Sequence, residues 1–313
     1  MIEIQNVSRR YGSVQALTNV SLKVEQGSVL GLLGQNGAGK TTLLNILTGY
    51  LAPTEGRVLI DGCDPLLEPA QAKRYLGYLP EHPPLYDEMT VREYLMFAAE
   101  LKGVEKRAIR AHVDEVMELT GLTAMRSRML GHLSKGYRQR AGMAQALCGD
   151  PDVLVLDEPT VGLDPMQITE IRGLIRTLGK GRTIVFSSHI LSEVQQLCDH
   201  VVILDSGVIR LDAPLQSVGE KDEITLLVTI AAAESSIVSK LRQLDGVRRV
   251  TVQPTAHVDQ TTALVTFYRQ NEPERRLFGL LSNLGMPLLH LSRVEDTLEQ
   301  VFMNAVSGGG KTR

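Results

Sequence analysis

Nine consecutive residues near the N-terminus form a loop that could bind phosphate groups. The segment fits G-x-x-x-x-G-K-[ST] in full and consists of Gly34, Gln35, Asn36, Gly37, Ala38, Gly39, Lys40, Thr41 and Thr42. The apolar run Val29–Leu33 precedes it and a helical pattern follows it, which is the context that this motif requires. The glycines let successive backbone N–H groups point inward, and the helix N-terminus adds partial positive charge. The sequence therefore predicts that Lys40 reaches the β- and γ-phosphates and that the Thr41 hydroxyl holds Mg²⁺.

Two adjacent acids end a second apolar strand pattern. Asp157 and Glu158 directly follow the run Val153–Leu156. A buried strand ends in two carboxylates where a cation or a reaction needs them, because burying unpaired charge is unfavourable. Asp157 is placed to bind Mg²⁺, directly or through water, and Glu158 to polarise an attacking water as a general base. The alternative is a solvated strand end before a turn at Pro159; the phosphate loop favours the first interpretation.

A histidine follows a third strand pattern. His189 comes shortly after the run Thr183–Ser187 and could donate a hydrogen bond to a γ-phosphate while holding the water and Glu158 in place. A lone histidine after a strand is more often a packed or surface residue. The catalytic interpretation of His189 therefore depends on the other motifs.

A further motif gives the set a family resemblance. Residues 133–140, Leu-Ser-Lys-Gly-Tyr-Arg-Gln-Arg, open a helix and resemble the signature sequence of ATP-binding cassette (ABC) proteins, with Lys135 replacing a glycine and Tyr137 the usual glutamine. Gly162–Pro165 is similar to the family's D-loop, and the histidine described above matches its switch histidine. All the family's motifs follow in order over about residues 1–215. The chain resembles an ATP-binding, ATP-hydrolysing subunit of an ABC transporter.

The resemblance implies further residues of an ATP site. Tyr11 matches the aromatic side chain that stacks on adenine, although a lone tyrosine there would otherwise be interpreted as a core or hairpin residue. Ser134 and Gly136 match the residues that cap the γ-phosphate of ATP bound to a second subunit. The family's Q-loop usually carries glutamine where this chain has Glu81, a carboxylate that can still meet Mg²⁺ or its water but cannot donate a hydrogen bond and adds charge.

Three segments resemble one branch of the family. Tyr78–Glu81 and Leu133–Tyr137 look like those of ABC-2 type exporters, among which the gliding-motility and nitrous-oxide-reductase-maturation ATPases are similar subunits. Val294–Phe302 also resembles the C-terminal end of these ATPases.

Alternating apolar runs and helical patterns over the first 210 residues predict the elements that position these side chains. They indicate an α/β fold with a mostly parallel sheet and helices on its faces. The resemblance specifies a P-loop NTPase: a RecA-like parallel sheet core with antiparallel β and helical subdomains. We expect this nucleotide-binding domain to span residues 1–217, with the helical subdomain at about 82–150.

The order of elements changes after Pro214. A strand–helix–strand–strand–helix–strand pattern over Glu223–Leu291 predicts a small α+β split-βαβ (ferredoxin-like) domain over residues 218–305. We expect a closing helix over Val294–Asn304 and a flexible tail over residues 306–313. This domain could regulate or dimerise the protein, and packing with dimer contact is the interpretation that we favour; such sandwiches also bind ligands, but the sequence shows no constellation for one.

Composition excludes several classes of protein. The 313 residues carry 33 Lys and Arg against 36 Asp and Glu, a net charge of −3, which argues against general adhesion to nucleic acid or anionic lipid. No apolar stretch approaches the about 18 to 20 residues of a membrane-spanning helix, and no secretory signal is evident. Three widely spaced cysteines indicate buried thiols in a reducing compartment. The cytoplasm is the expected location.

The resemblance also implies an assembly. Two copies would sandwich two ATP-Mg²⁺, and closure and hydrolysis would drive a separate integral membrane permease, so that the chain would be peripheral on the inner face of the cell membrane. The alternative is a soluble ABC ATPase acting on ribosome or DNA, or a regulator without a transport role. That class usually carries tandem cassettes or long coiled-coil inserts, which this sequence lacks, and transport is therefore the favoured interpretation.

Overall fold

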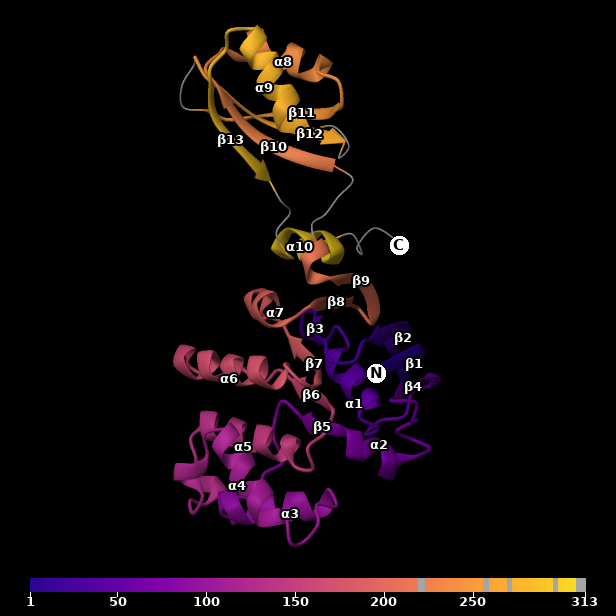
Figure 1. The fold of residues 1–313 in the computed structure, drawn as a ribbon. Helices are drawn as coiled ribbons and strands as arrows, with labels where there is room; N and C mark the ends of the chain where they lie inside the picture. Colours follow the sequence, from indigo (N-terminus) through magenta and orange to yellow (C-terminus); the bar gives the residue numbers. More distant parts are fainter. Residues whose placement is uncertain (219–222, 256–258, 269–271, 295–297, 308–313) are drawn as a thin grey trace. The chain divides into compact units, whose positions relative to one another are not determined.

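The chain folds into two compact units. The computed structural model describes residues 1–218, 223–255, 259–268, 272–294 and 298–307. The large unit comprises Met1–Gln216 with the residues from Phe302 onward, and the small unit comprises Ser217–Val301. Figure 1 labels their elements.

Two sheets build the large unit. The strands of the first are β3 (Val29–Leu33), β5 (Leu76–Leu79), β6 (Val153–Asp157), β7 (Thr183–Ser188), β8 (His200–Asp205) and β9 (Val208–Pro214). Their order is β5-β6-β7-β3-β8-β9, parallel except for the β8–β9 hairpin at one edge. The strands β3, β6 and β7 are buried throughout, as expected for parallel strands covered on both faces. A mostly parallel sheet is confirmed.

The second sheet of the large unit is antiparallel. Its strands are β1 (Ile2–Tyr11), β2 (Val14–Val24) and β4 (Glu55–Ile60), in the order β2-β1-β4. Register shifts interrupt both pairings of β1. These irregularities blur the period of two that marks a strand in the sequence, and no strand was predicted for residues 2–24.

Helices surround these sheets. In the large unit they are α1 (Lys40–Leu47), α2 (Pro69–Tyr75), α3 (Val91–Leu101), α4 (Ile109–Leu119), α5 (Lys135–Leu147), α6 (Pro165–Leu178) and α7 (Leu191–Leu197), with the short 3₁₀ turns Thr123–Met125, Leu130–His132 and Leu215–Ser217. Figure 1 shows α3, α4 and α5 grouped together, and contacts join all three pairs. Thr90 and Glu93 form a capping box that begins α3. Helix α5 also packs on β5, which ties this helical group to the edge of the parallel sheet.

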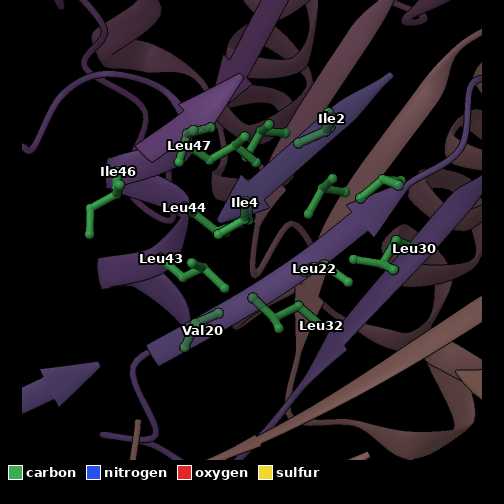
Figure 2. Packing of buried hydrophobic residues seen from close by; sticks show 14 of the residues in the cluster. Ile2, Ile4, Val20, Leu22, Leu30, Leu32, Leu43, Leu44, Ile46 and Leu47 are labelled. Carbon is green, nitrogen blue, oxygen red and sulfur yellow. The ribbon is translucent and has the colours of Figure 1, made fainter. Parts of the chain in front are cut away.

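The core of the large unit fixes the helix that follows the phosphate loop. Figure 2 shows buried side chains turned toward one another from β1 (Ile2, Ile4), β2 (Val20, Leu22), β3 (Leu30, Leu32) and α1 (Leu43, Leu44, Ile46, Leu47). None of them is more than 6% exposed. Because α1 is packed against strands of both sheets, its first turn cannot shift without disturbing the core.

The small unit is a split-βαβ sandwich, as predicted. It contains β10 (Glu223–Ile230), α8 (Glu234–Gln243), β11 (Val247–Gln253), β12 (Thr261–Tyr268), α9 (Pro273–Asn283) and β13 (Leu288–Val294). The sheet order is β11-β12-β10-β13, and every pairing is antiparallel. Strand β12 therefore separates β10 from β11, the two strands that α8 connects. Leu226, Phe267 and Leu277 are fully buried in its apolar core.

The C-terminal elements differ from the expected ones. Val294 does not begin a helix: it is the last residue of β13 and pairs with Thr225 of β10. Helix α10 (Leu298–Ser307) starts later and continues into the segment expected to be a flexible tail. Leu298 and Phe302, one turn apart on the helix, are both buried. Residues 308–313, the rest of that expected tail, lie outside the described residues.

The structure also bears on the expectations about membrane-spanning helices and cysteines. In the described ranges, no helix combines the length and the apolar character needed to cross a bilayer. Cys63, Cys148 and Cys198 are all buried and free, in agreement with the prediction of buried thiols.

Candidate nucleotide-binding and catalytic site

One pocket brings together most of the predicted chemistry. It has a volume of about 410 Å³ and is lined by Ala16, Gln35, Asn36, Gly37, Gly39, Lys40, Thr41, Thr42, Glu81, Glu158, Val161 and His189. The phosphate loop thus faces the candidate general base, the switch histidine and the glutamate at the Q-loop position. Sequence reasoning missed Ala16 and Val161, whose small apolar side chains carry no recognisable signal.

The phosphate loop needs glycine at two of its turns. Gly37 and Gly39 have φ values of +82° and +105°, in the left-handed region that glycine adopts without strain. A Cβ on Gly39 would also lie 2.8 Å from the carbonyl oxygen of Ala16. Gly39 is the residue that precedes α1, and the first turn of that helix contains no acid. The positive end of the helix dipole therefore faces the pocket without local neutralisation, which favours an anion there.

Lys40, Glu158 and His189 form a chain of contacts across the pocket. The Lys40 Nζ donates to the carbonyl oxygens of Gly34 (2.7 Å) and Gln35 (3.3 Å) and lies 3.3 Å from Glu158 Oε1. The other carboxylate oxygen, Glu158 Oε2, lies 2.8 Å from His189 Nδ1. The Lys40 and Glu158 side chains are 6% and 9% exposed, whereas that of His189 is 43% exposed. One carboxylate therefore contacts both the phosphate-loop lysine and a histidine that reaches solvent.

The ends of β6 and β7 hold Asp157 and Glu158 in place. Ser187 Oγ donates to Asp157 Oδ1 (2.6 Å) and accepts from the backbone N–H of Glu158 (2.9 Å). Glu158 has a φ of +46°, a left-handed conformation that costs a non-glycine residue about 1–3 kcal/mol. Such strain persists where surrounding contacts enforce it, and Ser187 is one of them. Sequence reasoning missed Ser187; a hydroxyl at the end of the predicted strand Thr183–Ser187 was the available signal.

Asp157 is an unusual carboxylate. It is fully buried, and burial raises its pKa above the ordinary value; the hydroxyl groups of Ser187 and Thr41 oppose this shift, and the charges of Glu158 and Glu81 add to it. Its Oδ2 makes no hydrogen bond with any described residue. An orphaned buried carboxylate oxygen, with a hydroxyl and further carboxylates nearby, fits a hard divalent cation, which prefers oxygen ligands.

Six predicted site residues are not among those that line this pocket. Gly34 and Ala38 belong to the phosphate loop and Asp157 directly precedes Glu158, whereas the other three lie in different segments. Tyr11 ends β1, is 45% exposed and has the Arg9 guanidinium 4.7 Å above its ring centroid. Ser134 is exposed at the start of α5 and makes no side-chain cap hydrogen bond. Gly136 is buried against Gln167 of α6, where a Cβ would meet the Gln167 side chain at 2.6 Å. Their roles remain predictions from the resemblance.

Comparison with known proteins extends beyond the site. The model of the ABC transporter family matches residues 17–161. The chain is 34% identical over 311 residues to the bacitracin transport ATP-binding protein BcrA of Bacillus licheniformis, covering 99% of this chain and 98% of that protein. It is 38% identical over 307 residues to YxlF of Bacillus subtilis (strain 168), an uncharacterized ABC transporter ATP-binding protein, covering 98% and 99%. These relatives match both units.

Solved structures match a smaller share of the chain. The dimeric post-hydrolysis cassette MJ0796, bound to ADP and phosphate, has a TM-score of 0.63 and 25% identity and covers 69% of this chain and 99% of that one. The protein cbiO1 of Clostridium perfringens, part of the transporter complex cbiONQ, has a TM-score of 0.64 and 28% identity, covering 77% and 94%. The fold, the motifs and the full-length relatives agree: the chain belongs to the ABC transporter ATP-binding protein family and is an ATPase subunit of that family.

Proposed function

We propose that the 410 Å³ pocket binds ATP with Mg²⁺ and that Glu158 is the general base for its hydrolysis. The observation that carries this proposal is the position of the Glu158 carboxylate, 3.3 Å from the phosphate-loop lysine and 2.8 Å from His189. A base at that point would face a water beside the γ-phosphate. General base catalysis of this kind contributes about 10²- to 10⁴-fold to a rate.

The other residues of the pocket have distinct roles in this proposal. The backbone N–H groups of residues 34–42 and the ammonium group of Lys40 bind the phosphates. Mg²⁺ would neutralise charge on them, held by Thr41, Asp157 and Glu81. His189 orients Glu158 through its Nδ1 and can donate from its other ring nitrogen.

The adenine end of the proposed site is built around Tyr11. Tyr11 stacks on the base in our proposal, and Ala16, which lines the pocket, packs beside it. Stacking would require the Tyr11 ring, half-exposed beneath Arg9, to offer one face to the nucleotide. An adenine ring and the Arg9 guanidinium could then occupy opposite faces of the Tyr11 ring.

We propose that two copies of the chain complete two ATP sites. Ser134 and Gly136 stand at the start of α5, where free backbone N–H groups form a second anion site, yet neither lines the pocket of its own chain. A γ-phosphate held by the partner copy would use those donors. MJ0796, which matches the large unit in fold, was solved as a dimer. The small unit is proposed to add packing and dimer contact.

A permease of the membrane is the second proposed partner. A groove of about 660 Å³ includes Tyr50, Tyr78 and Pro84 in its lining, and an adjoining hollow of about 500 Å³ shares Pro84 and adds Phe97 and Leu101. Tyr50 is 83% and Leu101 71% exposed, so this face offers large apolar side chains close to the Q-loop. A short apolar helix of a permease fits such a face. We infer a cytoplasmic location at the inner face of the membrane and an exporter of the ABC-2 type.

Replacing Glu158 by glutamine tests the catalytic proposal. Glu158→Gln keeps the size and one acceptor oxygen but cannot take a proton, so we expect ATP turnover to fall by about 10²-fold or more while ATP affinity stays within about threefold. Glu25→Gln, at an exposed carboxylate paired with Lys23, is the matched control. Turnover at the unmutated rate in Glu158→Gln would overturn the proposed role of Glu158.

A further inference from the structure

Glu193 is a buried acid that belongs to none of the sequence motifs described above. Glu193 belongs to α7, four residues after His189, and its side chain is 0% exposed. A buried carboxylate is unfavourable unless hydrogen bonds and opposite charge compensate its lost hydration. The partners of Glu193 therefore indicate what the chain gains from burying it.

Three side chains from three different segments donate to this carboxylate. Thr160 Oγ1 and Ser188 Oγ both lie 2.9 Å from Glu193 Oε2. Arg172 Nη2, from α6, lies 3.2 Å from Glu193 Oε1. Both oxygens of the carboxylate are thus engaged, and hydrogen bonds to a charged acceptor are shorter and stronger than those to a neutral one.

The two hydroxyl donors flank the catalytic residues in sequence. Thr160 is the second residue after Glu158, in the turn that the hydrogen bond from Val161 N–H to the Glu158 carbonyl oxygen closes. Ser188 directly precedes His189, and its Oγ also accepts from the backbone N–H of Ile190 (3.0 Å), the residue that follows the histidine. The backbone on both sides of His189 is therefore fixed by Ser188.

One carboxylate consequently sets the separation of two loops that carry reacting groups. The loop after β6 presents Glu158 and the loop after β7 presents His189, and these side chains must meet for their 2.8 Å contact. An apolar residue at position 193 could anchor α7 without burying charge. It could not hold the Thr160 and Ser188 hydroxyls at a common point, because that requires an acceptor.

We propose that Glu193 is a positioning residue for ATP hydrolysis, which acts through Thr160 and Ser188 to hold Glu158 and His189 at hydrogen-bond distance. The inference rests on the proposed catalytic roles of Glu158 and His189. Small displacements of reacting groups reduce rates strongly, by about 100-fold for 1 Å. Glu193 is not among the residues that line the pocket, so it would act through other side chains.

The first test removes one hydroxyl at a time from the full-length chain. In Thr160→Val and Ser188→Ala, Glu193 keeps its remaining donors, so the fold is preserved. We expect kcat for ATP to fall about tenfold in each with KM unchanged within about twofold, because the phosphate loop is intact. Thr160→Ser restores the hydroxyl and should recover kcat.

The matched control is Thr120→Val. Thr120 is equally buried and donates to the Val116 carbonyl oxygen within the helical group, away from the pocket. Its replacement should lower the melting temperature but leave kcat unchanged. An equal loss of kcat in Thr120→Val and Thr160→Val, or no recovery in Thr160→Ser, would overturn the proposal.

The second test asks whether the loss passes through the histidine. If Ser188 acts by placing His189, then Ser188→Ala should cost little further activity in a chain that already carries His189→Ala. The same fold-loss in both backgrounds would contradict that route. Loss of turnover in Glu158→Gln together with full turnover in Thr160→Val and Ser188→Ala would overturn the positioning role alone, whereas full turnover in Glu158→Gln would overturn the proposed function.

Discussion

The two units of the chain both pack helices on β-sheet, but they differ in whether charged side chains are buried in their cores. Among the described residues of the large unit, four charged side chains are buried: Lys40, Asp157, Glu158 and Glu193. In the described part of the small unit, the buried polar side chain is Thr261, and the rest of the core is apolar. Burying charge does not stabilise a fold by itself. We propose that the large unit retains these groups for chemistry and that the small unit serves packing and dimer contact.

The positions of the four buried charges in the fold support a chemical role for them. Asp157 ends β6 and Glu158 follows it, whereas Glu193 lies in α7, the helix after β7. Lys40 begins α1, the helix after β3, and the parallel strands β6, β7 and β3 are neighbours in the sheet. Ligands of open α/β sheets bind at the carboxyl ends of the strands. The small unit's sheet is entirely antiparallel and has no such common edge.

The largest effect is expected from removing Lys40, the one buried cation among the residues that the structure describes. Lys40→Ala takes away the phosphate-binding ammonium and leaves Glu158 buried without its cationic partner, so ATP affinity should fall by about 100-fold or more. Isothermal titration calorimetry with ATP measures this. Lys23→Ala, at an exposed surface pair, should bind ATP normally. Intact affinity in Lys40→Ala would remove the basis for the phosphate-loop assignment.

A core substitution in the small unit should separate stability from chemistry. Phe267→Ala empties a fully buried position and should destabilise the small unit by about 3–5 kcal/mol. ATP turnover per folded chain should stay within about twofold. Denaturant titration followed by circular dichroism gives the first quantity, and Tyr268→Ala, at the half-exposed neighbour, is the control. A collapse of turnover while the chain remains folded would show that the small unit takes part in catalysis.

A smaller effect is expected at the Q-loop position. Glu81 adds negative charge near Asp157, which raises the pKa of Asp157 and should strengthen cation binding. In Glu81→Gln the apparent affinity for Mg²⁺ should fall about threefold, with maximal turnover retained, because the amide oxygen can still meet the ion or its water and only one charge is lost in a partly solvated site. Turnover measured against free Mg²⁺ tests this. An unchanged or higher Mg²⁺ affinity would exclude Glu81 from the cation site.

The smallest effect is expected from replacing Glu93, an exposed acid outside the pocket. The backbone N–H and the hydroxyl of Thr90 lower the pKa of Glu93 in the capping box of α3. A lowered folded-state pKa contributes stability above the unfolded pKa, and this contribution is lost as pH falls through the folded value. Glu93→Ala should therefore lower the melting temperature at pH about 7 and much less at pH about 3. ATP turnover should not change, and a pH-independent difference would contradict this account.

The site was largely predictable because its motifs are local. The phosphate loop, Asp157, Glu158 and His189 are each recognised within a few residues of sequence, and parallel strands bring such segments to one edge. The sequence did not predict roles for Ser187, Thr160 and Glu193. The role of a single hydroxyl or acid depends on its hydrogen-bond partners, which here lie about 30 residues away in the sequence. Those supports are tertiary features with no fixed spacing.

The fold was predictable where hydrophobic periodicity is clean. The buried strands β3, β6 and β7 and the alternating strands of the small unit were found from their patterns. The bulged strand β1 was missed, and helix α10 was misplaced because Val294 pairs with Thr225 across a distance that the sequence pattern does not encode.

We propose that the buried charges of the large unit serve hydrolysis of ATP held between two copies of the chain. The most direct measurement is the nucleotide content and the mass of Glu158→Gln after incubation with ATP and Mg²⁺, by chromatography and light scattering. We predict a dimer that retains two ATP molecules, because binding and closure survive while hydrolysis does not. A monomer, or a dimer that contains ADP after a single round of binding, would contradict the account.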